Sequence, residues 1–373
     1  MVLLIGNYPL ERQYSMQRFA AMMLHGLSTA GISTEIIYPR PYLGKFFTGV
    51  PFIAKWLAYF DKFVLFPLQL RNKLREHPAV VHICDHSNAM YDGHIRHTPV
   101  VITCHDLIAV RSALGEDTHC PVSFTGKLLQ RWILRGLRRA DAIGCISEAT
   151  RQDARRLVSP NGVSPTVEVI VLGLNYPYRK LPEAQVEARL KKYPKIAKPF
   201  VIHVGSNLPR KNRPGVLRIF ARTKEQWNGR LVFAGEPLSP ELMSLAETLG
   251  VADRVIQITD PSGETLEALY NAAVALVYPS YSEGFGWPII EAQACGCPVI
   301  CSNVNPLPEA AGDAGLFHDL EDEEGFANDI LRLNEAGGRA VWSEKGLRNV
   351  ERFSTTTMIS QYLNIYRRIG ATL

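Results

Sequence analysis

The 373-residue sequence lacks a long uncharged apolar run, a strong excess of charge of one sign and any low-complexity tract. Without such a run no membrane-spanning helix is expected, and the opening MVLLIGNYPLERQ has too short an apolar stretch for a signal peptide. The 41 basic and 36 acidic residues leave a net charge of +5, which is too small to indicate binding to nucleic acid. We therefore expect a globular, cytoplasmic protein without a nucleic-acid partner.

The sequence also lacks the features of a disulfide framework or a metal site. Its seven cysteines are odd in number, and several lie in apolar strand-like runs such as VVITC at 100–104, so we expect reduced, buried thiols. Cys295, Cys297 and Cys301 lie close together, but Pro298 interrupts them and no fourth ligand is near. We therefore expect no bound metal.

Short runs rich in valine and isoleucine alternate with segments of helical pattern. This alternation predicts parallel β-sheets covered by helices on both faces. The first series of runs spans residues 2–6, 34–38, 79–83, 100–104, 142–146 and 167–172, and the second spans 200–205, 230–235, 254–258, 274–279, 298–302 and 315–319. Because the chain is too long for one hydrophobic core, we predict an α/β fold of two doubly wound, Rossmann-like domains facing a central cleft that holds the ligand.

The predicted domains are residues 1–175 and 199–354. The linker between them is placed at 176–198, which is rich in proline and lysine and has no buried strand pattern. Residues 355–373 are predicted to form a terminal amphipathic helix, because their apolar side chains recur at helical spacing. These side chains are Met358, Tyr362, Ile365 and Tyr366.

Residues 282–298, SEGFGWPIIEAQACGCP, carry the strongest functional pattern. They follow the strand pattern VALVYP, and Pro288 suits the first turn of a helix that ends near Gly296. Gly284 and Gly286 then form a strand-to-helix turn whose free amides favour an anion. Ile289 stands where a dinucleotide fingerprint needs a third glycine, and no Gly-Lys-Ser/Thr follows, so neither a dinucleotide site nor a P-loop is indicated.

Two glutamates, Glu283 and Glu291, flank this turn and would repel a bare phosphate. A ligand with both phosphate and hydroxyl groups removes the conflict, since amides face the phosphate and carboxylates accept hydrogen bonds from hydroxyls. Sugar nucleotides are such ligands. The adjacent cations Arg210 and Lys211, which follow the strand pattern FVIHVG, suit a diphosphate; alternatively they form a solvated basic loop.

The segment EGFGWPIIEA resembles the EX7E motif of the retaining glycosyltransferases of family four, also called glycosyl transferases group 1, which have the GT-B fold. The resemblance runs from the first strand to the terminal helix. It implies that Glu291 holds the ribose hydroxyls, that Glu283 meets the donor sugar, and that the amides of Gly284, Phe285 and Gly286 line the sugar and diphosphate. The terminal helix would cross back to the acceptor-binding N-terminal domain.

The resemblance also extends to residues outside this motif. Arg210 and Lys211 resemble the diphosphate ligands of the family. His105 and Asp106, just past a strand end in VVITCHDLIAV, resemble its His-Asp pair facing the donor sugar. Alternatively, His105 is a strand-end histidine satisfied by Asp106, while His203 is expected to be structural.

The implied reaction moves a hexose from a nucleoside diphosphate sugar, UDP- or GDP-linked, to a hydroxyl of a glycan, lipid or small metabolite. It retains the anomeric configuration by a front-face route and needs no cofactor. The first loop departs from the paired glycines frequent in the family, since it reads GNYPLERQ with Gly6 kept and Tyr8 and Arg12 adding bulk. Gly6 and Tyr8 are expected near the acceptor or diphosphate, with an unusual acceptor preference.

Other functions stay open on the sequence alone. A non-hydrolysing sugar-nucleotide epimerase shares the two-domain architecture, and a nicotinamide-linked dehydrogenase is disfavoured by the missing glycine fingerprint. A catalytically silent scaffold is the non-enzymatic alternative. It would use residues 45–75, where aromatic residues interleave with Lys and Arg as in an interfacial helix beside anionic lipid. The alternative for this segment, which we favour, is a mostly buried helix with a charged edge.

Overall fold

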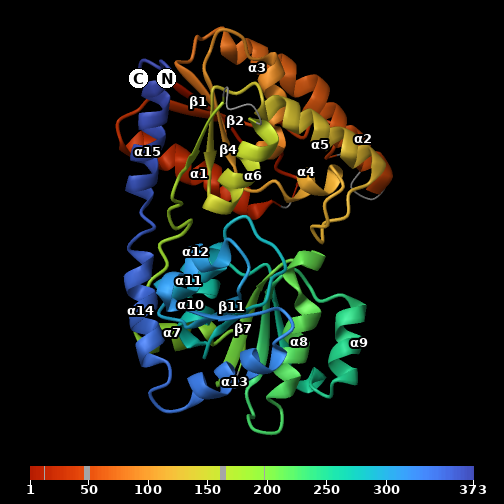
Figure 1. Cartoon of the computed structure of the whole chain (residues 1–373), viewed down its shortest axis with the longest axis vertical. Helices are drawn as coiled ribbons and strands as arrows, with labels where there is room; N and C mark the ends of the chain where they lie inside the picture. The colour runs from red at the N-terminus through yellow and green to blue at the C-terminus, as the bar shows by residue number, and fades with distance from the viewer. Residues whose placement is uncertain (12, 46–50, 160–164, 197) are drawn as a thin grey trace. The chain divides into compact units, whose positions relative to one another are not determined.

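The computed structural model describes all residues except 12, 46–50, 160–164 and 197, so Arg12 and the start of the segment 45–75 lie outside the description. The chain forms two compact units (Figure 1). Unit 1 contains residues 1–116, 122–175 and 354–373, and unit 2 contains 117–121 and 176–353. Each unit has a six-stranded sheet whose paired strands are parallel, which confirms the predicted pair of doubly wound α/β domains.

The sheet of unit 1 has the order β2-β1-β3-β4-β5-β6. Its central strands are buried over their whole length, as valine- and isoleucine-rich strands covered on both faces should be. The strands are β1 Val2–Ile5, β2 Thr34–Ile37, β3 Val80–Ile83, β4 Val100–Cys104, β5 Ala142–Cys145 and β6 Thr166–Val169. The helices are α1 Tyr14–Thr29, α2 Pro51–Phe60, η1 Asp61–Leu65, α3 Phe66–Leu74, η2 His86–His94, α4 Ile108–Ala113, α5 Phe124–Leu137, α6 Glu148–Val158 and α15 Thr355–Arg368.

The sheet of unit 2 has the order β12-β11-β10-β7-β8-β9. Its strands are β7 Phe200–Gly205, β8 Arg230–Gly235, β9 Val255–Thr259, β10 Leu276–Tyr278, β11 Val299–Ser302 and β12 Gly315–His318. The helices are α7 Glu183–Leu190, η3 Pro209–Lys211, α8 Arg213–Arg222, α9 Pro240–Thr248, η4 Ala252–Arg254, α10 Gly263–Ala272, α11 Trp287–Ala294, α12 Leu307–Ala311, η5 Gly312–Ala314, α13 Glu323–Asn334 and α14 Ala340–Val350.

The terminal helix α15 belongs to unit 1 and packs on its sheet through two buried tyrosines. His82 of β3 bonds to the Tyr366 hydroxyl through Nδ1 at 2.5 Å and to Thr103 of β4 through Nε2 at 2.8 Å. The Tyr362 hydroxyl lies 2.7 Å from the same Thr103 hydroxyl. This buried network satisfies the polar atoms that the amphipathic helix brings into the core.

The segment 176–198, predicted as a linker, is part of unit 2 and contains α7. Arg189 of α7 pairs with the buried carboxylate of Glu267 in α10 at 2.5 Å. The backbone amide of Arg179 donates to the same carboxylate at 3.0 Å. These contacts fix the segment against α10.

No helix of the described residues is long and apolar enough to cross a membrane. The described part of the segment 45–75 forms α2, the π-helical η1 and α3 in succession. Asp61, which interrupts the apolar run, is fully buried and accepts hydrogen bonds from the Tyr8 hydroxyl at 2.9 Å and the Gly44 amide at 3.0 Å.

Candidate active site

The glycine-rich turn of unit 2 joins the carboxyl end of β10 to α11. Gly286 is the residue before the helix and has φ 104°, a conformation that glycine adopts freely. A Cβ there would lie 2.9 Å from Leu307 Cδ2 and too close for ordinary packing. Pro288 occupies the first turn of α11, which begins at Trp287, one residue before the predicted start, so the turn lies where the sequence predicts it.

Glu283 is the centre of a tight polar cluster in this turn. Its side chain is only 6% exposed, and its Oε2 accepts from Arg210 Nη1 at 2.6 Å. Its Oε1 accepts from Lys211 Nζ at 2.6 Å and from the Tyr278 hydroxyl at 2.8 Å. Lys211 also donates to the Tyr278 hydroxyl at 2.7 Å. The structure therefore brings three of the predicted residues into direct contact.

The charges of this cluster determine its protonation. Burial alone would raise the pKa of Glu283, but the nearby Lys211 and Arg210 cations and their hydrogen bonds lower it to about 2. Burial and the same carboxylate raise the pKa of Tyr278 well above its usual value. Near neutral pH the cluster thus holds one carboxylate against two cations, and the excess positive charge suits an anionic ligand.

The two cations are positioned by a short turn after β7. Residues 209–211 form the 3₁₀ turn η3, and Asn212 follows in the left-handed conformation with φ 51°. The Asn212 side chain caps α8 by accepting from the Gly215 amide at 3.1 Å and donates to the Pro279 carbonyl at 3.0 Å. One asparagine therefore ties the cation turn to the loop that carries Glu283.

Glu291 lies on the second turn of α11 and is almost fully buried. Its Oε2 accepts from the Tyr270 hydroxyl of α10 at 3.0 Å. Burial first, and then this carboxylate, raises the pKa of Tyr270 well above its usual value. Glu291 and Glu283 thus keep separate partners, with a tyrosine beside each.

His203 of β7 lies beneath the cluster and is fully buried. Its Nδ1 donates to the Val277 carbonyl at 3.0 Å, and its ring stacks on Tyr278 at 5.9 Å between centroids. Burial, above all other influences, lowers the pKa of His203 to about 3, so the ring is neutral. These contacts agree with the structural role predicted for His203.

Residues 117–121, which the sequence did not single out, contact the same loop within unit 2. The His119 ring stacks on Tyr281 at 4.5 Å and 21°. The Ser282 hydroxyl donates to the Thr118 carbonyl at 3.4 Å, and the Ser282 carbonyl accepts from Arg210 at 3.1 Å. The loop before Glu283 is therefore held between this segment and Arg210.

The remaining predicted residues lie at the carboxyl ends of the strands of unit 1. His105, after β4, is buried and donates from Nε2 to the Cys84 carbonyl at 2.9 Å. Its Nδ1 has no hydrogen-bond partner among the described residues, so it remains an acceptor inside the protein. Asp106 accepts from the amide of Ile108, the first residue of α4, at 3.1 Å, and no hydrogen bond joins it to the His105 ring among the described residues.

Gly6 and Tyr8, the two predicted residues of the first loop, have different surroundings. A Cβ at Gly6 would meet Ile36 and Ala20 only at ordinary contact distances, so packing does not require glycine there. Tyr8 is buried with its hydroxyl on Asp61. The side chain of Asn7, between them, donates to Asp85 Oδ2 at 2.5 Å, while its Oδ1 has no partner in the described part of the chain.

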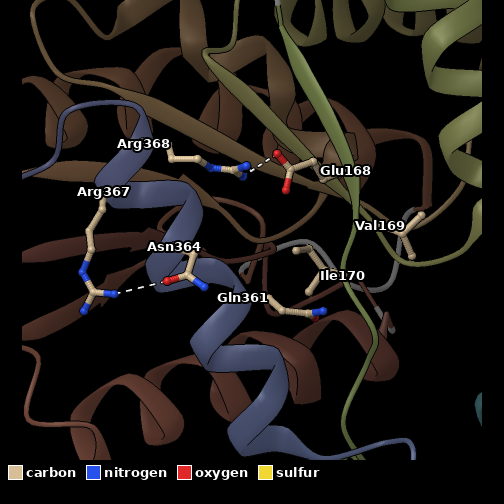
Figure 2. A pocket seen from close by; sticks show the side chains of 7 residues that line it. All are labelled: Glu168, Val169, Ile170, Gln361, Asn364, Arg367 and Arg368. Carbon is tan, nitrogen blue, oxygen red and sulfur yellow. Dashed lines mark hydrogen bonds and ion pairs between the residues drawn. The ribbon is translucent and has the colours of Figure 1, made fainter.

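Two cavities of the units contain none of the predicted site residues. One, of about 470 Å³, lies between β6 and α15 of unit 1, where Arg368 pairs with Glu168 and Arg367 bonds to Asn364 (Figure 2). The other, of about 620 Å³, is lined by the carboxyl ends of α10, α11 and α13 in unit 2. Both lie away from the strand ends that carry the cluster.

Among the described residues, no group of three or more His, Cys, Asp or Glu side chains is arranged to hold a metal ion. The seven cysteines are free, and six of them are buried. Burial raises the pKa of Cys297 to about 12 and keeps that thiol protonated. The buried thiols therefore act as small apolar side chains.

Comparisons with known proteins place the chain among related sequences. Residues 186–347 match the family model of glycosyl transferases group 1, and residues 16–176 match that of glycosyltransferase family 4. The O-antigen chain mannosyltransferase B of Escherichia coli is 30% identical over 65% of this chain and 64% of its own length. The D-inositol 3-phosphate glycosyltransferase of Rhodococcus jostii is 30% identical over 80% of this chain and 69% of its own. The chain thus spans about two thirds of the length of these relatives.

Solved structures are similar over nearly the whole chain. Sucrose-phosphate synthase of Thermosynechococcus elongatus matches with a TM-score of 0.77 at 21% identity, covering 99% of this chain and 98% of that one. The Anabaena protein HepE in complex with UDP matches with a TM-score of 0.70 at 16% identity, covering 99% and 100%. At these identities the likeness shows the fold alone, which is GT-B.

Proposed function

The chain belongs to the family-four, group 1 glycosyltransferases, and from this premise we propose that it transfers a sugar from a nucleoside diphosphate sugar to a hydroxyl acceptor, with retention of configuration. The observation that carries the proposal is the cluster of Glu283 with Arg210 and Lys211 beside the strand-to-helix turn. Two neighbouring loops thus offer cations for a diphosphate and a carboxylate for sugar hydroxyls, beside the amides of the turn.

The cluster suggests an exchange of partners when the donor binds. A diphosphate carries more negative charge than one carboxylate, so it competes with Glu283 for Arg210 and Lys211. Each hydrogen bond that a cation moves to the diphosphate frees a lone pair on Glu283 for a sugar hydroxyl. The cations then stabilise the negative charge that develops on the leaving diphosphate, where a preorganised donor contributes about 100- to 1,000-fold in rate.

The acceptor step is proposed to follow the front face of the donor sugar. The bond from the anomeric carbon to the diphosphate breaks, the acceptor oxygen bonds to the same carbon, and the leaving phosphate takes the acceptor's proton. His105, with Nε2 fixed on a carbonyl, offers Nδ1 only as an acceptor and so suits a sugar hydroxyl. No cofactor or metal is included in this proposal.

A hexose is proposed as the transferred sugar, with UDP or GDP as its carrier. The relatives support the class of enzyme and differ in substrate, since one is named as a mannosyltransferase and another as a D-inositol 3-phosphate glycosyltransferase. For the acceptor we propose a hydroxyl of a glycan, lipid or small metabolite. Gly6 and Tyr8 stay predicted parts of the loop near it, although the Tyr8 hydroxyl is held by Asp61.

Thermal unfolding with nucleotides tests donor binding directly. We expect one of UDP, GDP, ADP and TDP to raise the melting temperature by about 5 °C or more at 100 times its dissociation constant, since such binding adds about 2.7 kcal/mol. If UDP, GDP or ADP is that nucleotide, its 2′-deoxy form should raise the melting temperature less in the wild type; TDP already lacks the 2′-hydroxyl. In Glu291→Gln, the two forms should act alike. Equal shifts in the wild type would contradict the role of Glu291 on the ribose, and a shift with NAD alone would favour the dehydrogenase.

Replacement of His119 tests whether residues 117–121 position the catalytic loop. Loss of its stack on Tyr281 in His119→Ala should lower kcat about 3- to 10-fold, because an aromatic pair contributes about 0.5–1.5 kcal/mol. Release of sugar from the identified donor to water or acceptor measures this. The control His119→Phe keeps the stack and should restore kcat. If the phenylalanine variant is as slow as the alanine variant, stacking is not the cause.

We also propose that the protein works in the cytoplasm and contacts the inner face of the membrane peripherally through part of residues 45–75. Free, mostly buried thiols support a reducing compartment. The exposed aromatic side chains of α2 support the membrane contact, because tryptophan and phenylalanine favour the bilayer interface.

A further inference from the structure

One surface of unit 1 exposes apolar side chains from two neighbouring helical elements. The first element is the rod formed by α2, η1 and α3, and the second is α5. We call their exposed side the two-helix face. Its exposed apolar residues are Ile53, Trp56 (54%), Phe60, Val64 and Leu68 on the rod, and Phe124 (77%), Leu128 and Trp132 on α5.

The π-helical turn keeps the apolar residues of the rod closer to one side than a regular α-helix would. From Trp56 to Leu68 they recur every four residues, a step that drifts by about 40° in a regular α-helix. The π-turn η1 takes more residues per turn and so offsets this drift midway along the rod. Asp61, the first residue of η1, points into the protein, where its carboxylate accepts hydrogen bonds from the Tyr8 hydroxyl and the Gly44 amide.

The rod and α5 form a continuous surface. A ladder of rings joins them, with Trp56 to Tyr59 at 5.8 Å, Tyr59 to Phe63 at 5.4 Å and Phe63 to Trp132 at 5.4 Å between centroids. Figure 1 shows α5 beside the rod. The exposed residues of both elements therefore belong to one face and are not scattered singly.

Cations outnumber acids on both elements. Residues 123–139 contain five cations and no acidic residue. Arg139 pairs with Asp92 and Arg138 donates to the Leu157 carbonyl, so the remaining cations of α5 are Lys127, Arg131 and Arg135. On the rod, the only acid within 51–75 is the buried Asp61. Lys62 pairs with Glu11, and Lys73 pairs with Glu35 and with Glu76 just after the rod; the exposed cations of the rod are then Lys55, Arg71 and Arg75.

We infer that the two-helix face docks on an anionic lipid bilayer, with α5 contributing as much as the segment 51–75. Aromatic and leucine side chains enter the interface between headgroups and acyl chains, while the arginines and lysines meet lipid phosphates. No helix of the described residues is long and apolar enough to cross a membrane, so we infer a peripheral contact. The inference deepens the membrane contact proposed above and is independent of sugar transfer, because binding to lipid needs neither donor nor acceptor.

Co-sedimentation of the full chain with vesicles tests the inference. Vesicles of phosphatidylcholine with about 30% phosphatidylglycerol should bind the protein at low salt, and 1 M salt or pure phosphatidylcholine should release most of it. The double variant Lys127→Gln/Arg131→Gln on α5 should bind about 30-fold more weakly, since each cation near the surface contributes about 1 kcal/mol. The double variant Phe124→Ser/Leu128→Ser should bind the same vesicles at least about 10-fold more weakly.

Matched controls lie on α14 of unit 2, where Arg348→Gln and Val341→Ser change an exposed cation and an exposed apolar residue. Both should bind as the wild type does. The inference is overturned if the wild type ignores the anionic vesicles or binds neutral ones equally, or if the α5 variants bind unchanged. It is also overturned if those variants abolish a concentration-dependent dimer in sedimentation velocity, because the face would then bind a second copy.

Discussion

Replacing Glu283 with glutamine should lower kcat for sugar transfer by about 100-fold or more, while the fold is kept. The amide has the same shape but no charge, so it loses charge-assisted hydrogen bonds that contribute about 1.5–3 kcal/mol each. It also leaves Arg210 and Lys211 without the carboxylate that aligns them at 2.6 Å. Steady-state transfer with the identified nucleotide sugar gives kcat and KM, and far-ultraviolet circular dichroism checks the fold.

The same variant should change the pH dependence of stability. The pKa of Glu283 falls from 4.5 to about 2 on folding, so its ionised form contributes about 3 kcal/mol to the free energy of unfolding. Because the folded pKa is the lower one, this contribution is complete well above pH 4.5 and is lost as the pH falls from 4.5 toward 2. Urea unfolding at pH 7 should show Glu283→Gln less stable than the wild type, with the difference shrinking below pH 4.5.

An exposed glutamate on α9, Glu247, gives the matched control. Glu247→Gln should leave both kcat and the pH dependence of unfolding close to the wild type. A wild-type kcat in Glu283→Gln would remove this carboxylate from the reaction. A stability difference that stays constant from pH 7 to pH 3 would instead show that the carboxylate is not held ionised by its two cations.

The cluster around Glu283 could be predicted from the sequence because its elements follow strand ends. Arg210 and Lys211 follow β7, and Glu283 follows β10, a neighbour of β7 in the sheet. Carboxyl ends of neighbouring parallel strands lie at one edge, so adjacency in the sheet brings these residues together. Glycine and proline in the stretch 284–288 marked the turn itself.

The tyrosines of the site could not be predicted in the same way. Tyr278 lies in the apolar run VALVYP, and Tyr270 lies in an amphipathic helix, so both fit a core pattern. A tyrosine buries its ring and uses its hydroxyl at the far end, and a hydrophobic pattern registers only the ring. Their hydroxyls reach Glu283 and Glu291, which only the packed structure reveals.

Long-range polar contacts explain the other gaps in the sequence analysis. Composition suggested a linker at 176–198, but in the structure Arg189 of this segment pairs with Glu267 of α10. A local sequence pattern cannot indicate an ion pair between residues so far apart in the chain. Similarly, nothing in residues 117–121 identifies His119 as a neighbour of Tyr281. By contrast, His105 and Asp106 were expected to act as a pair, whereas in the structure the Asp106 carboxylate accepts a hydrogen bond from the Ile108 amide at the start of α4.

Arg210 gives the second prediction with a large effect. Arg210→Ala should lower kcat/KM for the donor by about 100- to 1,000-fold, as expected for a donor aimed at the charge of the leaving group. The nucleoside diphosphate should bind about 10- to 100-fold more weakly, since a hydrogen bond to a charged group is lost. The nucleoside without phosphates should bind as before. Calorimetric titration of both ligands separates the two effects.

Arg222→Ala on α8 is a matched control, because Arg222 pairs with Glu323 in an exposed ion pair that contributes about 0–1 kcal/mol. It should leave both affinities unchanged. In Arg210→Ala, Glu283 keeps Lys211 and Tyr278 as its partners among the described residues. Its pKa should then rise above about 2, and the acid limb of the pH–rate profile should move to higher pH. If the diphosphate and the bare nucleoside lose affinity together, Arg210 acts by holding the loop at Ser282, and the diphosphate must bind elsewhere.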